Sequence, residues 1–156
     1  MNLTPAVRAL LAKPGVTVGP GVKLPISEFR NTEITAVLPL PPSTNNLFLS
    51  VGRRRVRTRE YREWAAVAAG LLAGMSPVTA ERFAVVITVV GGRGLNPARD
   101  LDNFAKPTLD ALVAAGVLRG DSIRDGLRSV AVNHEDGDGE AGVRVGVREW
   151  PTPGPG

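Results

Sequence analysis

The chain has 156 residues, a formal net charge of +4 and a pI near 10.3, with no cysteine and a single histidine. One domain is therefore expected, and disulfides, thiolate zinc sites, cysteine nucleophiles and multi-histidine metal sites are excluded. Any bound metal must be held by oxygen, which favours hard cations such as Mg²⁺, Mn²⁺ or Ca²⁺. The longest apolar run, Trp64 to Met75, is too short to span a bilayer, and Arg8 and Lys13 interrupt the first segment, so we expect no secretory signal and a cytoplasmic protein.

The first third of the chain predicts an irregular arm followed by one strand and one helix. Prolines and glycines recur through residues 1–33, which indicates a loosely ordered arm. Ile34 to Leu40 predicts a strand that Pro41 and Pro42 end. Apolar residues recur at helical spacing from Glu60 to Met75, which predicts an amphipathic helix entered directly from a run of arginines.

The remaining elements complete an α/β pattern. Phe83 to Val90 is a β-branched run and predicts a buried strand. The apolar stripe from Leu101 to Val113 predicts a second helix, which should begin near Asp102 or Asn103 because Pro107 is tolerated only in a first turn, and should end at Gly116. Leu127–Asn133 and Val143–Val147 flank a glycine- and aspartate-rich turn and predict a hairpin with one wet face. The order β-α-β-α-β-β indicates a small mixed β-sheet with two main helices over residues 34–150, followed by a flexible tail at 151–156.

Positive charge is concentrated in the arginine run. Six arginines fall within ten residues, at positions 53, 54, 55, 57, 59 and 62, whereas acidic residues cluster near 135–140. Such uneven placement indicates a face that contacts phosphates. Asn45 and Asn46, just before this run, either form a turn or position a substrate strand.

Four residues around the second helix suggest metal-assisted chemistry. Asp100 and Asp102 are two residues apart at its start, where an extended backbone would project both carboxylates to one side. Lys106 follows one turn later, and Asp121 comes after the helix, where the returning chain can reach the sheet edge. Three carboxylates and a lysine suit phosphodiester hydrolysis, in which Mg²⁺ activates water and the lysine supports the leaving or non-bridging oxygen.

The same residues also permit a purely structural interpretation. Asp102 and Asn103 would cap the helix, Asp102 would pair with Lys106 for about 0.3 kcal/mol, and Asp100 would be a solvated loop acid. Asp121 would then be an ordinary turn aspartate.

Two segments, LPLPPSTNN at 38–46 and DLDNFAKPTLDALVAAGVLRGDS at 100–122, resemble the RusA family of Holliday junction resolvases. The resemblance covers roughly residues 34–150. It rests on the aspartate pair with its asparagine, the lysine three residues after that asparagine, the LDAL segment, and an aspartate about fifteen residues beyond the lysine. It implies a dimeric α/β protein of the cytoplasm of a bacterial or phage-infected cell. Such a protein binds four-way DNA junctions and nicks two strands symmetrically with Mg²⁺, or with Mn²⁺, in recombination and repair.

The resemblance also implies roles for particular residues. Asp100, Asp102 and Asp121 would be the metal-binding carboxylates, and Lys106 would be catalytic. The residues facing DNA would be Arg53, Arg54, Arg55, Arg57 and Arg59, with Asn45 and Asn46 beside the substrate. Two positions depart from the family pattern: Gly120 stands where an acidic residue is often found, and Ile123 where a glutamine is common.

Two other functions stay open at this point. The same fold could serve a non-catalytic, junction-binding architectural protein whose acids are helix caps and ion pairs. It could also serve a nuclease for other branched DNA, such as replication forks and flaps.

Overall fold

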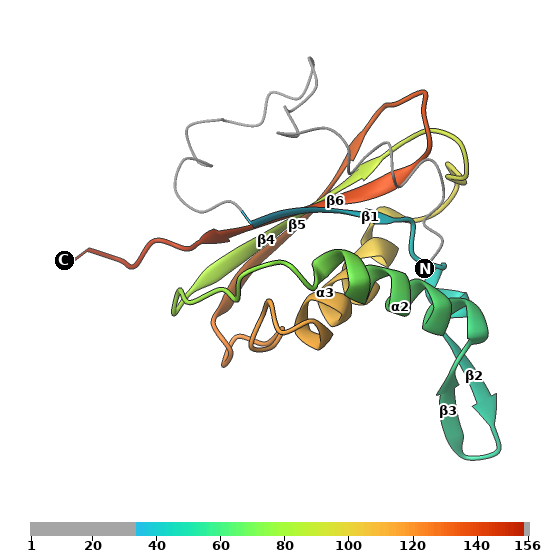
Figure 1. Ribbon diagram of the computed structural model, residues 1–156, viewed down its shortest axis with the longest axis horizontal. Helices are drawn as coiled ribbons and strands as arrows, with labels where there is room; N and C mark the ends of the chain where they lie inside the picture. Colours follow the sequence, from blue (N-terminus) through green and yellow to red (C-terminus); the bar gives the residue numbers. More distant parts are fainter. Residues whose placement is uncertain (1–33, 155–156) are drawn as a thin grey trace.

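The main sheet has four strands in the order β1-β6-β4-β5 (Figure 1). The computed structural model describes residues 34–154, so the expected arm at 1–33 and the last two residues of the expected tail lie outside the described residues. β1 (Ile34–Pro39) runs antiparallel to β6 (Gly142–Glu149), and β6 runs antiparallel to β4 (Phe83–Val90). β4 and β5 (Leu127–Glu135) are parallel. The mixed α/β class expected from the sequence is therefore confirmed.

The predicted hairpin between the last two strands is wrong. β5 and β6 lie on opposite sides of β4, and residues 136–141 join them past the end of β4. There, Arg93 N donates to Gly139 O at 2.8 Å and Ala141 N donates to Arg93 O at 2.9 Å. The reason lies in β4, whose side chains are mostly buried on both faces, so that it takes a central place with a partner at each edge. Local turn residues cannot reveal a third strand inserted between two neighbours in sequence.

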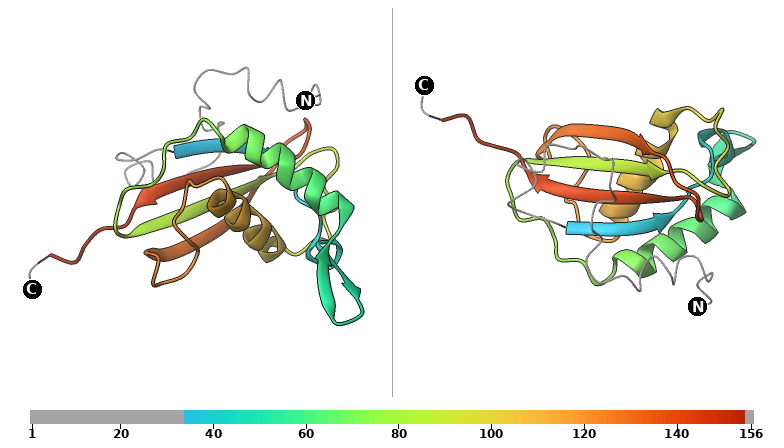
Figure 2. Two further views of the ribbon diagram at one scale, coloured as in Figure 1. Left: turned by 60° about the horizontal axis from the view of Figure 1, so that its bottom comes forward. Right: turned by 90° about the horizontal axis from the view of Figure 1, so that it is seen from above.

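Within residues 34–154, two α-helices cover one face of the sheet (Figure 2). They are α2 (Arg59–Leu72) and α3 (Ala105–Ala114). Val143, Val145 and Val147 of β6 point to this side and are buried, as their alternation predicts. The core contains these valines together with Leu38, Tyr61, Leu72, Phe83, Val85, Ile87, Val89, Phe104 and Leu112. Within residues 34–154, no helix has the length and apolar character needed to cross a membrane.

A short 3-10 helix, η3 (Leu101–Phe104), leads into α3. Helical structure thus begins one residue before the predicted start. Pro107 is the third residue of α3, where a missing amide costs no intrahelical hydrogen bond. Gly116 has φ +76° and ends the helix as predicted. The chain then turns back, because the amides of Val117 and Leu118 both donate to Leu112 O, at 3.0 and 3.3 Å.

Residues 48–57 form a second, two-stranded sheet that the sequence does not predict. β2 (Phe48–Val51) pairs antiparallel with β3 (Arg54–Arg57). Gly52, in the two-residue turn between them, has φ +62°, a conformation that favours glycine. The hairpin extends away from the sheet and helices (Figure 1), so most of the arginine run lies on this projecting hairpin.

Thr58 connects this hairpin to α2 and to the 3-10 turn η2 (Thr44–Asn46). Its hydroxyl oxygen accepts a hydrogen bond from Tyr61 N at 3.1 Å, and its hydroxyl donates to Asn46 O at 2.5 Å. Thr58→Ala removes both bonds and is expected to lower the free energy of unfolding by about 1–2 kcal/mol, measured by urea denaturation. Thr58→Ser keeps the hydroxyl and should lose less than about 0.5 kcal/mol. Equal losses in the two variants would contradict the capping role.

Candidate functional site

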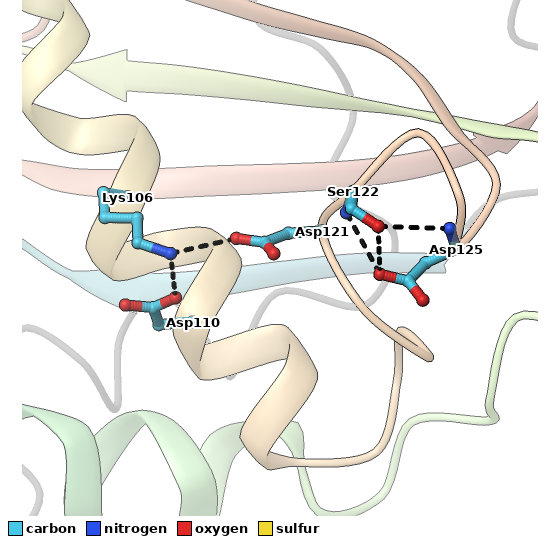
Figure 3. Close-up of polar contacts among 5 residues, drawn as sticks. All are labelled: Lys106, Asp110, Asp121, Ser122 and Asp125. Carbon is cyan, nitrogen blue, oxygen red and sulfur yellow. Dashed lines mark hydrogen bonds and ion pairs between the residues drawn. The ribbon is translucent and has the colours of Figure 1, made fainter.

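Lys106 lies between two carboxylates on the solvent side of α3 (Figure 3). Its Nζ is 2.8 Å from Asp110 Oδ1 and 3.0 Å from Asp121 Oδ2. The hydrogen bonds to Asp110 and Asp121 raise the pKa of Lys106 above its ordinary value, although burial acts in the opposite direction. The lysine side chain is 62 % exposed, so the ammonium is charged and accessible to a ligand. The fold thus brings together two predicted site residues, Lys106 and Asp121, that come from different segments.

The loop that carries Asp121 is held by two local arrangements. Ser122 donates to Asp125 Oδ2 from its amide at 3.2 Å and from its hydroxyl at 2.6 Å (Figure 3). These bonds hold the pKa of the Asp125 carboxyl below its usual value. Arg119 donates to the carbonyl oxygens of Ala80, Glu81 and Asp125, which ties the loop to the segment before β4.

The same loop contains Gly120, one of the two departures from the family pattern. A Cβ atom at position 120 would lie 2.1 Å from Asp125 Oδ2. Gly120 therefore leaves room for the Asp125 carboxylate, which occupies the space that a side chain at position 120 would take.

Asp100 and Asp102 stand exposed at the start of η3. Asp100 is the N-cap by position, but its side chain makes no capping hydrogen bond. Among residues 34–154 neither carboxylate forms an ion pair, so the alternative Asp102–Lys106 pair is not observed, and Lys106 contacts Asp110 and Asp121 instead. Nor does this part of the chain contain a cluster of three or more His, Asp or Glu side chains that could hold a metal ion. The three predicted carboxylates are therefore not assembled around one point.

Arg99, which no sequence motif singles out, fastens the loop after β1 to the start of η3. Its guanidinium donates to Pro41 O at 2.7 Å and to Pro42 O at 2.8 Å, and it lies 3.9 Å from the centre of the Phe104 ring. Burial lowers the pKa of Arg99. This contact joins the two segments that carry the family resemblance, because one contains Pro41 and Pro42 and the other begins at residue 100, next to Arg99.

Tyr61 connects the base of the hairpin to the lysine site. Burial raises the pKa of Tyr61, and the nearby Asp110 carboxylate raises it further. On its other side the ring lies 5.9 Å from the Phe48 ring, with the Arg57 guanidinium 5.0 Å from its centre. The arginine-bearing hairpin therefore begins close to Asp110, which forms the shorter of the two ion pairs of Lys106.

The predicted DNA-contacting residues differ in their surroundings. Arg53, Arg54, Arg55 and Arg57 are exposed on the hairpin, whereas Arg59 pairs with Glu63 at 2.8 Å on α2. Asn45 and Asn46 are exposed in η2, at the base of the hairpin. All of these side chains lie on the β2–β3 hairpin or beside its base.

Comparison with known proteins adds no direct match: neither a protein-family model nor a curated protein matches this chain. The resemblance to the RusA family thus rests on the two motif segments. In the structure, the first segment runs from the end of β1 through η2, and the second covers η3, α3 and the loop that follows.

Proposed function

We propose that this protein is a RusA-like, Mg²⁺-dependent endonuclease that resolves four-way DNA junctions by paired symmetric nicks in recombination and repair. The observation that carries the proposal is the 3.0 Å contact between Lys106 and Asp121, fifteen residues apart in sequence. These are the lysine and the third carboxylate of the family motif. Their meeting on an accessible surface supports a reaction centre beside the first turn of α3.

The proposed cation is supported by the donor chemistry and not by the present positions of the donors. Carboxylate oxygens are suitable ligands for Mg²⁺, and Asp100 and Asp102 form no ion pair within residues 34–154. However, the three carboxylates do not converge, and Lys106 holds one oxygen of Asp121. A bound Mg²⁺ would supply an activated water and neutralise charge on the phosphate. The part played by the chain itself is the charged ammonium of Lys106, available to stabilise an oxygen of the cleaved phosphate.

The exposed arginines of the hairpin would contact DNA phosphates, with Asn45 and Asn46 beside the substrate strand. Phosphate contacts position a protein on DNA without reading its sequence. The active unit would be a homodimer, since a two-fold axis repeats one site for the opposite strand of a junction that itself has approximate two-fold symmetry.

Replacing Arg53, Arg54 and Arg55 together with alanine is expected to weaken DNA binding and to flatten its dependence on salt. The slope of log K against log salt should change by up to about 0.9 for each phosphate that the variant no longer neutralises. Arg59→Ala is the comparison variant, since Glu63 already pairs with this arginine and its removal should change the slope less. Fluorescence anisotropy across a salt series measures both. An unchanged slope in the triple variant would show that these side chains are merely solvated.

A cleavage assay tests the proposed function directly. A synthetic four-way junction, a linear duplex of the same sequence and a flap are incubated with and without Mg²⁺. Paired cuts in the junction alone, and only with Mg²⁺, are expected. Junction binding without cutting would favour the architectural alternative, for which the double ion pair of Lys106 is the supporting observation, because it is a complete structural role for this side chain. Preferential cutting of the flap would point to the alternative nuclease.

A further inference from the structure

The β2–β3 hairpin has two chemically different faces. Residues paired across an antiparallel ribbon share a face, and successive residues alternate. Phe48 therefore shares a face with Arg57, and Ser50 with Arg55, whereas Leu49 shares the other face with Val56, and Val51 with Arg54. The side chains of this second face are Leu49, Val51, Val56 and Arg54.

The first face attaches the hairpin to the domain and the second is open. Arg57 and Phe48 contact the Tyr61 ring of α2, and Arg55 lies 4.7 Å from the centre of the Phe48 ring. On the second face, Leu49 is 59 %, Val51 62 % and Val56 41 % exposed. Half of the exposed large hydrophobic side chains among residues 36–154 lie on this one small face, which we call the apolar face of the hairpin.

The charge around the apolar face indicates what covers it. Residues 44–59 include five arginines and no acidic residue. A second copy of the hairpin would bring two arginine clusters together in an unfavourable arrangement. DNA can bind both kinds of side chain on the hairpin. Its phosphates pair with arginines, and the flat faces of its base pairs bind apolar side chains.

The geometry of branched DNA makes this contact selective. Apolar side chains that enter a continuous duplex must unstack a base step, at a cost of a few kcal/mol. At a branch point stacking is already interrupted, so the same side chains meet base pairs at a lower cost.

We infer that the apolar face of the hairpin, formed by Leu49, Val51 and Val56, docks on the exposed base pairs at a DNA branch point while the neighbouring arginines contact the phosphates of the arms. The inference rests on the proposed function in taking branched DNA as the substrate, and it is independent of whether the DNA is cut. The hairpin then provides selectivity for branches, whereas the arginines provide attraction to any DNA.

The test is a triple variant, Leu49→Thr with Val51→Thr and Val56→Thr, which removes apolar character but keeps residues that favour strands. Binding to a four-way junction and to a linear duplex of the same sequence is measured without Mg²⁺, so that cleavage plays no part. The triple variant should bind the junction roughly tenfold or more weakly, because less apolar surface is buried, and bind the duplex with unchanged affinity and salt slope. A 2-aminopurine base at the branch should change its fluorescence with the wild-type protein and not with the variant.

Arg53→Ala with Arg54→Ala is the matched control, and it should weaken binding to both DNAs and flatten both salt slopes. Val51→Thr alone changes the shape of the side chain very little, so this variant is expected to fold even if the triple variant does not. It should show a smaller loss of affinity confined to the junction. Equal losses of affinity on junction and duplex, an unchanged junction affinity, or a triple variant that sediments as a smaller oligomer would each overturn the inference. A wild-type protein that prefers the junction but never cuts it would refute the nuclease proposal and leave the inference standing.

Discussion

Asp121→Asn is expected to abolish Mg²⁺-dependent cutting of a four-way junction, with a loss of roughly 10³-fold or more, while junction binding is kept or tightened. Asparagine keeps the size of the side chain and an oxygen that can accept from Lys106, but it lacks the negative charge that attracts a cation. Removing that charge also reduces repulsion of the phosphates. Asp100→Asn and Asp102→Asn should behave in the same way, and single-turnover cleavage with a parallel binding measurement separates the two effects.

Asp138→Asn is the control for these variants, because it removes an exposed carboxylate from the segment that joins β5 and β6 without touching the candidate site. It should cut at the wild-type rate. Mixed dimers with one Asp121→Asn subunit should nick one strand of a doubly labelled junction and leave the opposite strand largely uncut. Full activity in any of the three site variants would refute the assignment of that carboxylate.

Lys106→Ala is expected to slow cutting by roughly 10²-fold if the ammonium stabilises charge in the transition state. Asp110→Asn should have a smaller effect, because Asp121 remains as a partner for the lysine. The double variant should be no slower than Lys106→Ala alone, since Asp110 acts through the lysine. Cleavage rates at saturating Mg²⁺ complete this cycle. Normal turnover in the Lys106→Ala protein would show that the ion pairs of this lysine have a structural role only.

Local patterns predict most of the secondary structure. The β-branched run Phe83–Val90 is a strand over those same residues, and the helical spacing after Glu60 corresponds to α2. Both signals depend on side chains a few residues apart. The hairpin at 48–57 is not predicted because the alternation in β3 is carried by a single valine, Val56, among three arginines, which are more typical of a charged loop.

Contacts between distant segments are not predictable in this way. The pairing of β4 with both β5 and β6 depends on the whole sheet, and local turn residues point instead to a hairpin. The clamps made by Arg99 and Arg119 reach carbonyl groups about forty to sixty residues away, and backbone carbonyls leave no trace in a sequence. At the candidate site, Lys106 contacts Asp110 one helical turn away, a spacing that can be read from the sequence, whereas its contact with Asp121 depends on the path of the chain after α3.

The position of β1 at an edge of the sheet has a consequence for how the chain folds. Among residues 34–154, β1 has one neighbour in the main sheet, and that neighbour is β6, about a hundred residues later. During synthesis at about 5–20 residues per second, the strand ITAVLP waits several seconds for its partner. Such a pairing closes a very long loop and slows folding. Because Ile34 faces Val147 across the antiparallel pair, a short peptide joining these two strands in a circular permutant would turn the most distant strand pairing of the domain into a local one.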